Sequence, residues 1–160
     1  MSIERARAHF RGCGLEGRIQ EFETSSATVE LAAQALRCEP ERIGKTLSFH
    51  VGEDVVLIVA AGDAKIDNAK FKAQFSTKAK MLAPDEVEPL VGHGIGGVCP
   101  FGVNEGVKVY LDVSLKRFVT VFPACGSANS AIELTLPELE QLSGSLGWID
   151  VCKGWENFQE

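Results

Sequence analysis

Two apolar runs in the first half of the chain predict a β-hairpin. The segment 43–49, IGKTLSF, and the run 55–61, VVLIVAA, are separated by Gly52-Glu53-Asp54, a sequence typical of a tight turn. The second run is apolar enough to be a buried strand. Lys45 stands near the start of the first strand, where a lysine either extends its ammonium to solvent or points it into a cleft.

The rest of the hydrophobic pattern mixes helical spacing with short strand-like runs. The segment 29–36 has apolar residues at 29, 32, 33 and 36 and follows several residues that can cap a helix. Further helices are expected at 2–12, 67–75, 84–90 and 137–142, and further strands at 18–22, 107–113, 118–122, 131–134 and 148–152. About seven strands without regular alternation predict one α+β domain over residues 1–160, with a mixed sheet that curls towards a barrel.

Composition limits the classes of protein to which the chain can belong. Apolar residues make up 45% of it and charged residues 24%, as in soluble globular proteins, and no signal sequence or membrane-spanning run is present. We therefore expect a cytoplasmic protein with no membrane partner. The five cysteines are an odd number without a C-x-x-C pair, which favours reduced thiols over disulfides or a zinc site.

Charge disfavours a broad nucleic-acid interface and a DNA partner, because the net charge is −6. One segment differs from this average: between 65 and 80 there are five lysines and a single acid, Asp67. This segment is either a solvated helix face or a small phosphate-contacting patch. In the second case Lys65, Lys70 and Lys72 are candidate contacts to the end of an RNA, but not to a long duplex.

Several motifs resemble known sites and fail their structural requirements. Gly44-Lys45-Thr46 looks like the end of a P-loop, but Glu39 stands where the first glycine should be and the lysine enters a strand. The glycines at 92, 94 and 97 match a dinucleotide fingerprint by letter, but they follow a predicted helix. The three histidines share no ligand spacing, so no metal site is expected. Cys99 and Cys125 lie beside turns and are interpreted as inert thiols rather than nucleophiles.

Three segments remain as candidates for chemistry. Lys45 supplies a cation, the glycines of the loop 94–102 expose backbone amides, and the loop 124–130 consists of small residues with hydroxyl and amide groups. A cation beside exposed amides suits an anionic or carbonyl-bearing ligand. The ordinary alternatives stay open, namely a solvated lysine and glycines that only shape a turn. No general base is apparent.

Taken together, six segments resemble the YbaK/EbsC family of editing domains associated with prolyl-tRNA synthetase. The matching sequences are TVELAA at 28–33, IGKTL at 43–47, VAAGD at 59–63, GGV-x-P-x-G at 96–102, VYLD at 109–112 and IEL at 132–134. The resemblance implies a freestanding aminoacyl-tRNA deacylase that acts on tRNA bearing a small, wrong amino acid. It also implies a mixed-sheet α+β fold without metal or cofactor.

The resemblance assigns roles to particular positions. The family's essential lysine falls on Lys45, and its substrate loop falls on Gly96, Gly97, Pro100 and Gly102. Some members carry a histidine or aspartate on the loop that corresponds to 123–131, and this chain has neither residue there. No single member's amino-acid specificity therefore transfers to this chain.

These roles give a mechanistic hypothesis. Lys45 anchors a phosphate or the ester region, the amides of Gly97 and its neighbours hold the carbonyl oxygen, and Thr46, Ser127 and Ser130 read a small side chain. The ribose 2′-hydroxyl of the substrate, or its side chain if that is a thiol, activates the water. The expected partners are the tRNA acceptor end and a prolyl-tRNA synthetase, and the oligomeric state stays open. The rival hypotheses are a non-catalytic binding module and a thiol enzyme.

Overall fold

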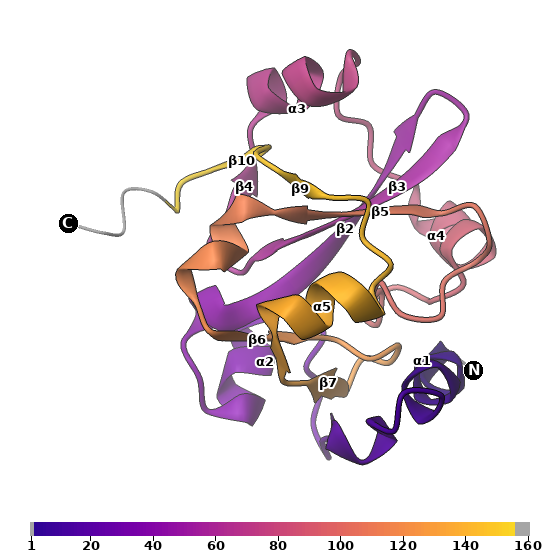
Figure 1. Cartoon of the computed structure of the whole chain (residues 1–160), viewed down its shortest axis with the longest axis vertical. Helices are drawn as coiled ribbons and strands as arrows, with labels where there is room; N and C mark the ends of the chain where they lie inside the picture. Colours follow the sequence, from indigo (N-terminus) through magenta and orange to yellow (C-terminus); the bar gives the residue numbers. More distant parts are fainter. Residues whose placement is uncertain (1, 156–160) are drawn as a thin grey trace.

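A six-stranded mixed sheet forms the centre of the molecule (Figure 1), with the strand order β8-β6-β2-β3-β5-β9. The computed structural model describes residues 2–155. The strands of this sheet are β2 (Ile43–Val51), β3 (Asp54–Ala61), β5 (Lys108–Asp112), β6 (Thr120–Pro123), β8 (Leu134–Thr135) and β9 (Trp148–Ile149). Two small antiparallel pairs lie outside it, β1 (Ile19–Glu21) with β7 (Ser130–Ile132) and β4 (Lys65–Ile66) with β10 (Cys152–Lys153).

The hairpin of β2 and β3 organises the sheet. Its register runs from Gly44 opposite Ala61 to Val51 opposite Asp54, and the residues of β3 from Val56 to Ala61 are buried. On its other side β3 pairs with β5 in parallel, and β5 pairs with β9 in parallel. A strand that is buried on both faces needs apolar side chains at every position, not only at every second one. This explains the continuous run of valine, isoleucine and leucine.

The outer edge of β2 is only partly paired. β6 runs parallel to it at Ile43 and Gly44, and the segment 80–82 joins it through the amide of Leu82 to the carbonyl of Ser48 at 3.1 Å. Between these two points, at residues 45–47, no described strand covers this edge. The sheet therefore has a gap three residues long in the middle of this edge.

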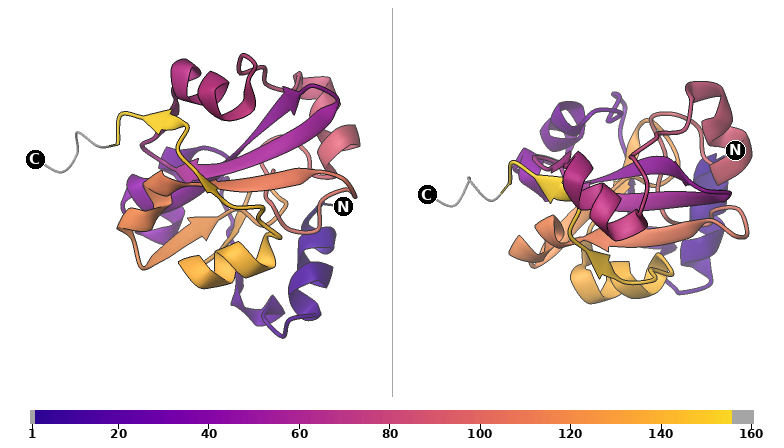
Figure 2. Two further views of the ribbon diagram at one scale, coloured as in Figure 1. Left: turned by 45° about the horizontal axis from the view of Figure 1, so that its top comes forward. Right: turned by 90° about the horizontal axis from the view of Figure 1, so that it is seen from above.

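Five α-helices surround the sheet (Figures 1 and 2). In Figure 1, α3 lies at the top, α4 on the right, α5 in front of the lower sheet, and α1 and α2 towards the bottom. Hydroxyl and carboxylate caps fix several starts, as for α2, where Thr28 accepts from the amide of Leu31 at 3.1 Å. The helices are α1 (Ser2–Arg11), α2 (Val29–Leu36), α3 (Asn68–Phe75), α4 (Pro84–Val91) and α5 (Leu136–Leu142).

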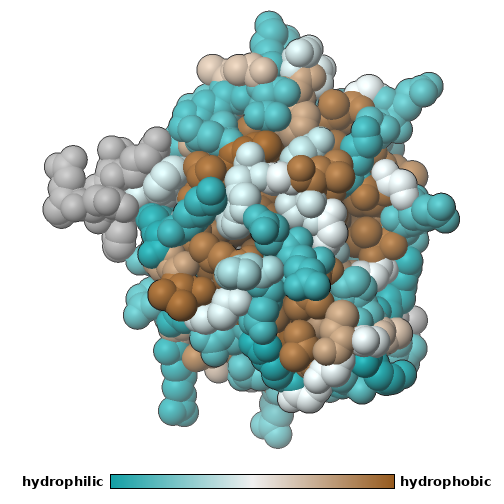
Figure 3. All heavy atoms as spheres, viewed as in Figure 1, coloured by the Kyte–Doolittle hydropathy of each residue, from teal (hydrophilic) through white to brown (hydrophobic). Residues whose placement is uncertain are grey.

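Three apolar clusters hold these elements in place. The largest contains Phe10, Phe49, Phe71 and Phe101 and joins α1 and α3 to the sheet. A second cluster packs Val87 and Val91 of α4 against Leu57 and Val109 of the sheet, and a third packs Ala32 and Ala33 of α2 against Ile43 and Phe122. On the face seen in Figure 3, hydrophobic residues come to the surface in separate patches between hydrophilic ones. None of the helices within residues 2–155 has the length and apolar character needed to cross a bilayer.

The predicted α+β architecture with a mixed sheet is confirmed, and the strand count is corrected. The expected strand at 131–134 divides at Glu133 into β7 and β8, which pair with different partners. The expected strand at 148–152 likewise divides into β9 and β10. The two-residue strand β4 was not predicted, because two residues are too few to show a period.

The capping box of α5 gives a prediction about pH and stability. Hydrogen bonds from Arg18 at 2.8 and 3.1 Å, and from the amide of Thr135, lower the pKa of Glu138 from 4.5 to about 2. A carboxyl with a lowered folded-state pKa stabilises the protein above its unfolded pKa, and this contribution is lost as the pH falls from about 4.5 towards 2. Glu138→Gln should therefore reduce the free energy of unfolding at pH 7 by about 0.5–1 kcal/mol, measured by chemical denaturation.

The difference between Glu138→Gln and the unmodified protein should shrink steadily below pH 4.5. Glu105→Gln is the matched control, because Glu105 is exposed and has no ion pair within residues 2–155. A difference that stays constant from pH 7 to pH 3 would contradict the assignment of the carboxylate charge as the cause.

Candidate functional site

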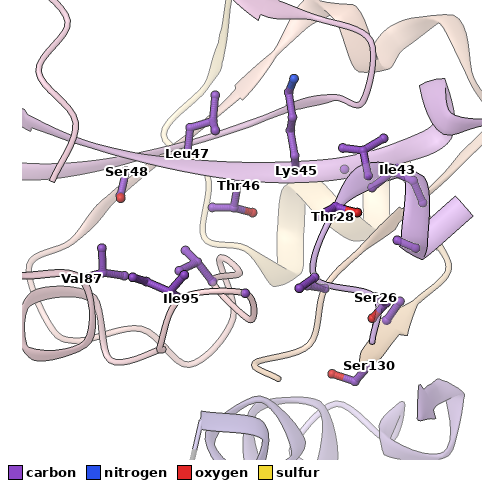
Figure 4. Close-up of a pocket in the computed structure, with 18 of the residues that line it drawn as sticks. Ser26, Thr28, Ile43, Lys45, Thr46, Leu47, Ser48, Val87, Ile95 and Ser130 are labelled. Atoms are coloured by element: carbon purple, nitrogen blue, oxygen red, sulfur yellow. The ribbon is translucent and has the colours of Figure 1, made fainter. Parts of the chain in front are cut away.

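A cavity of about 370 Å³ opens at the unpaired edge of β2 (Figure 4). Six consecutive residues of this strand, 43–48, line it. Side chains of a strand alternate between its two faces, so a cavity that touches every residue follows the edge rather than one face. The other walls come from α2, α4, the loop 94–98 and the segments 122–124 and 130–131. They are lined by Ser26, Ala27, Thr28, Val29, Ala32, Met81, Leu82, Pro84, Val87, Ile95, Gly96, Val98, Phe122, Ala124, Ser130 and Ala131.

The alternation of β2 separates its polar side chains into two groups. Figure 4 shows Lys45 and Leu47 pointing to one side of the strand and Thr46 and Ser48 to the other. Ile95 and Ser130 lie on the side of Thr46 and Ser48. The Lys45 cation and the hydroxyls of Thr46 and Ser48 therefore lie on opposite sides of the strand.

Lys45 is held by the turn after β3. Its ammonium donates hydrogen bonds to the carbonyl of Gly62, at 3.4 Å, and to the carbonyl of Ala64. Burial lowers the pKa of Lys45 below its ordinary value, and the nearby Asp63 opposes that shift. The expected convergence of this ammonium with the glycine loop is not seen, because the side chain points away from that loop (Figure 4).

The glycine loop contributes to the cavity through Gly96 and Val98. Gly96 has φ +90°, which favours glycine, and a Cβ there would lie 3.4 Å from the Cβ atoms of Ala27 and Ala128. Neither the Gly96 amide nor the Val98 amide donates to another described residue. Both residues line the first cavity, so their amides are candidate donors to a ligand there.

The amide of Gly97 is engaged within its own loop. It donates to the carbonyl of Gly94 at 3.0 Å, and the residue lines a second, neighbouring cavity of about 250 Å³. A Cβ on Gly97 would lie only 2.5–2.7 Å from backbone atoms of Gly126 and Ser127. Gly97 thus allows the two loops to pack closely, and the amides beside it are the ones left free.

Pro100 and Gly102 shape the loop from outside the cavity. Pro100 is buried and does not line either cavity. Gly102 has φ +65°, and a Cβ there would lie 2.7 Å from the carbonyl oxygen of Arg5. Gly102 lets the loop pack closely against Arg5 of α1, and the substrate-binding role of Pro100 and Gly102 stays a prediction.

The serines of the loop 124–130 form a small hydrogen-bonded group. The Ser127 hydroxyl lies 2.7 Å from the Ser130 hydroxyl and 3.0 Å from Oδ1 of Asn129. Ser130 is buried and lines the first cavity, whereas Ser127 lines the second. Of the two predicted serines, Ser130 is the one that lines the same cavity as Thr46.

Thr46 combines burial with an unused hydroxyl. Its Oγ1 is buried and has no hydrogen-bond partner within the part of the chain that the structure describes. The side chain lies on the side of β2 where Ile95 and Ser130 also lie (Figure 4). A buried polar atom without a partner is uncommon in folded proteins and calls for an explanation.

The predicted RNA-contacting lysines lie apart from both cavities. Lys65 and Lys72 are exposed, on β4 and α3. Lys70 forms an ion pair with Asp150 at 3.0 Å and donates to the carbonyl of Cys152 at 3.0 Å. Lys65 follows the turn whose carbonyls hold Lys45, and the two charges repel weakly.

The buried thiols are unsuited to nucleophilic chemistry. Cys99 and Cys125 are fully buried, and burial raises the pKa of Cys99 to about 12. Nε2 of His93 lies 3.5 Å from the Cys99 sulfur, a contact that no sequence pattern predicted. Nε2 of His93 is 2.6 Å from the carbonyl of Phe101, which fixes a proton on that nitrogen. The pair is a packed structural contact, and the thiol-enzyme hypothesis loses its nucleophile.

The cavity has few groups that could transfer protons. No carboxylate or imidazole is among its lining residues, and Lys45 is its one charged residue. Within residues 2–155, no group of three histidine, cysteine or acidic side chains comes together in a way that could hold a metal ion. The site can bind a small polar group and stabilise an oxyanion, but it contains no evident general base.

Comparisons with known proteins agree with this architecture. The model of the aminoacyl-tRNA editing domain family matches residues 23–142. The Bacillus subtilis (strain 168) protein YwhH is 60% identical over 157 residues, which cover 98% of this chain and 100% of that protein. The proline–tRNA ligase of Geobacillus sp. (strain WCH70) is 32% identical over 101 residues, which cover 62% of this chain but only 18% of the ligase.

A solved structure of a similar protein has the same fold as this chain. A candidate trans-editing enzyme for prolyl tRNA synthetase matches with a TM-score of 0.86 and 29% identity, over 96% of this chain and 98% of that one. The resemblance to the YbaK-type editing domains is thereby confirmed.

The contact between the two loops predicts a stability effect. Gly97→Ala should lower the free energy of unfolding by about 1–3 kcal/mol, because the added methyl group overlaps backbone atoms that cannot move independently. Gly17→Ala is the control, since a Cβ there meets nothing within 4 Å, and its effect should stay within about 0.5 kcal/mol. Chemical denaturation measures both. Equal stability of the two variants would show that the loops are not tightly packed.

Proposed function

The chain belongs to the aminoacyl-tRNA editing domain family, and we propose that it hydrolyses the ester bond of tRNA carrying a small, wrong amino acid. The observation that supports this most directly is the cavity at the open edge of β2, where the Gly96 and Val98 amides are free. Its volume of about 370 Å³ falls in the range of small-molecule sites, so it can hold an aminoacyl group with part of the ribose.

The free amides suit the transition state of ester hydrolysis. Attack of water on the carbonyl carbon places negative charge on the carbonyl oxygen, and preorganised amide donors stabilise that charge. The Gly97 amide is engaged within the turn, so we assign the oxyanion contact to the amides of Gly96 and Val98 instead. The open edge of β2 provides further main-chain groups at Thr46 for the rest of the aminoacyl group.

The proton transfer has to use the substrate. An aminoacyl ester is already activated, so orientation and charge stabilisation can supply much of the acceleration. The cavity lining includes no carboxylate or imidazole. We assign the proton acceptor to the ribose 2′-hydroxyl next to the ester, which relays a proton from the attacking water to the departing 3′-oxygen. The products are the free amino acid and the uncharged tRNA.

Lys45 is proposed to act on the RNA at the rim rather than on the ester. Its ammonium lies on the other side of β2 from Thr46, and the two carbonyls that hold it are weak competitors for a phosphate. Lys65 and Lys72 are exposed and can add to this electrostatic contact, whereas Lys70 is engaged with Asp150. The partner is the acceptor end of a tRNA, and the similarity to part of proline–tRNA ligase favours tRNA for proline.

Single-turnover incubation with a panel of mischarged tRNAs tests the activity. Loss of the ester from at least one tRNA bearing alanine, serine, threonine or cysteine is the expected result. Saturable binding without loss of any ester would establish the rival function, a binding module that senses the acceptor end.

Removal of the Lys45 cation should impair the reaction. Lys45→Ala should lower kcat/KM for deacylation by about 10²-fold, on the scale of losing one important electrostatic contact. If the contact is to a phosphate, part of the loss appears as a higher KM, and added salt weakens the unmodified protein more than the variant.

Lys153→Ala is the matched control for this variant. Lys153 is an exposed lysine on β10, opposite Lys65, and its loss should change kcat/KM less than threefold, about 0.65 kcal/mol. Circular dichroism should show that both variants fold. A folded Lys45→Ala protein with turnover close to that of the unmodified protein would remove Lys45 from the mechanism.

The proton route is tested on the substrate. A tRNA whose terminal ribose carries hydrogen in place of the 2′-hydroxyl, charged at the 3′-oxygen, should be hydrolysed at least about 10²-fold more slowly, the scale of general acid–base assistance. Its binding, measured by competition with uncharged tRNA, should change much less. Hydrolysis at an unchanged rate would exclude the 2′-hydroxyl as the proton acceptor.

A further inference from the structure

Several independent contacts fix the turn after β3 that holds Lys45. The carbonyls of Gly62 and Ala64 in this turn accept hydrogen bonds from the Lys45 ammonium. The Ala64 amide donates to the carbonyl of Ala61 at 3.0 Å, and the Gly62 amide donates to the carbonyl of Glu41 at 3.4 Å. These backbone bonds tie the turn to the end of β3 and to the segment before β2.

Close packing against α2 leaves the turn little room to shift. A Cβ on Gly62 would overlap the carbonyl oxygen of Pro40 and would lie 2.8 Å from Cγ1 of Val29. Val29 belongs to α2 and lines the first cavity. The turn is therefore in contact with a wall of the site, and a movement of the turn would carry the two carbonyls away from the ammonium that they hold.

The middle residue of the turn, Asp63, forms a two-point ion pair with Arg117. Nη1 and Nη2 of Arg117 donate to the two carboxylate oxygens at 3.0 and 2.6 Å. Only 11% of the arginine side chain and 21% of the aspartate side chain are exposed. Paired hydrogen bonds of this kind fix direction as well as distance, and partial burial reduces their screening by salt. The ion pair thus fixes the residue that lies between the two carbonyls.

Arg117 is itself fixed by its surroundings. Its Nε donates to the carbonyl of Ser114 at 2.9 Å. Its guanidinium also lies over the rings of Phe118 and Trp155, 4.8 and 5.2 Å from their centroids. The guanidinium therefore has one defined direction from which it holds Asp63.

The short helix η3 (Val113–Arg117) joins this ion pair to the sheet. The Ser114 hydroxyl accepts a hydrogen bond from the amide of Ala61, the last residue of β3, at 3.1 Å. Ser114 and Leu115 are fully buried. A helix anchored on β3 therefore supplies the arginine, and the turn directly after β3 supplies the aspartate.

This arrangement leaves Lys45 able to bind a ligand. An ammonium has three N–H donors, and the carbonyls of the turn accept only two of them. Within residues 2–155, the Asp63 carboxylate pairs with Arg117 and forms no ion pair with Lys45. A phosphate at the rim would thus meet an ammonium whose direction is set and whose charge no carboxylate contacts.

We propose that Arg117, acting through Asp63, is a positioning residue for Lys45. This inference rests on the proposed function, in which Lys45 contacts the RNA. Without the ion pair the turn gains freedom, so its carbonyls no longer hold the ammonium in one direction. Asp63 also becomes free to compete with a phosphate for the Lys45 charge. Arg117 lines neither cavity, so its effect on the reaction has to pass through the turn.

A double-mutant cycle tests whether Arg117 acts through Lys45. Arg117→Gln should lower kcat/KM for deacylation about tenfold, mainly through a higher KM, because the cation is misplaced. In a Lys45→Ala background the same change should lower kcat/KM less than about twofold, because the residue that it positions is absent. Equal losses in the two backgrounds would show a general structural role and overturn the inference. Unchanged activity of folded Arg117→Gln would also overturn it.

The position of the ammonium can be followed without any substrate. Burial is the main cause that lowers the pKa of Lys45, and the charged and titratable groups that act on it are Cys152, Asp63, Lys65 and Glu30. Arg117→Gln frees the turn and leaves the Asp63 charge unpaired, and both changes should raise the pKa of Lys45 towards its ordinary value. NMR titration of the lysine Cε resonances measures this pKa, with Lys45→Ala identifying the signal. An unchanged pKa would overturn the inference whether or not the protein is a deacylase.

Two further variants complete the test. Arg117→Lys keeps the charge and loses the two-point geometry, so both readouts should change in the same directions by smaller amounts. It takes the place of Arg117→Gln if that variant does not fold, as judged by circular dichroism.

Arg18→Gln is the matched control, because it breaks a comparable two-point ion pair with Glu138, at 2.8 and 3.1 Å, outside both cavities. It should change kcat/KM less than about twofold and leave the pKa of Lys45 as it is. A loss of activity equal to that of Arg117→Gln would trace both effects to reduced stability and overturn the inference.

Discussion

The interrupted pairing along the outer edge of β2 is the constraint on which the site depends. β6 covers the edge at Ile43 and Gly44, the segment 80–82 covers it near Ser48, and residues 45–47 between them are left open. An unpaired strand edge inside a protein is costly unless water or a ligand meets its backbone groups. Because α2 and α4 are packed on either side of this gap by their own apolar clusters, the gap becomes a walled cavity.

Strand β2 presents a cation on one side and a hydroxyl on the other. Consecutive residues of β2 point to opposite sides, so the Lys45 cation and the Thr46 hydroxyl are separated although they are neighbours in sequence. The turn after β3 holds the cation, and the hydroxyl is buried on the other side of the strand. A substrate that crosses the edge can thus place a charged RNA backbone on one side and a small acyl group on the other.

Sequence patterns predicted the hairpin and the helices well, because 55–61 is continuously apolar and 29–36 has helical spacing after a capping residue. The split strands near Glu133 and between 149 and 152 were not predictable, since strand partners distant in sequence decide where such short runs break. In the site, Lys45, Thr46, Gly96 and Ser130 all line one cavity, and their roles stay predictions. The positions of Gly97 and Gly102 were not foreseen, because a glycine needed for close packing and one needed for ligand contact look identical in sequence.

A site without its own general base has a consequence for selectivity. An enzyme that edits esters must leave correctly charged tRNA intact, and a strong base beside the ester would hydrolyse any acyl group that entered. When the proton acceptor belongs to the substrate, hydrolysis requires the ribose, the carbonyl and the free amides of Gly96 and Val98 to be aligned at once. Binding energy from the acyl side chain then determines whether that alignment is reached, so the contacts that discriminate amino acids also control the rate.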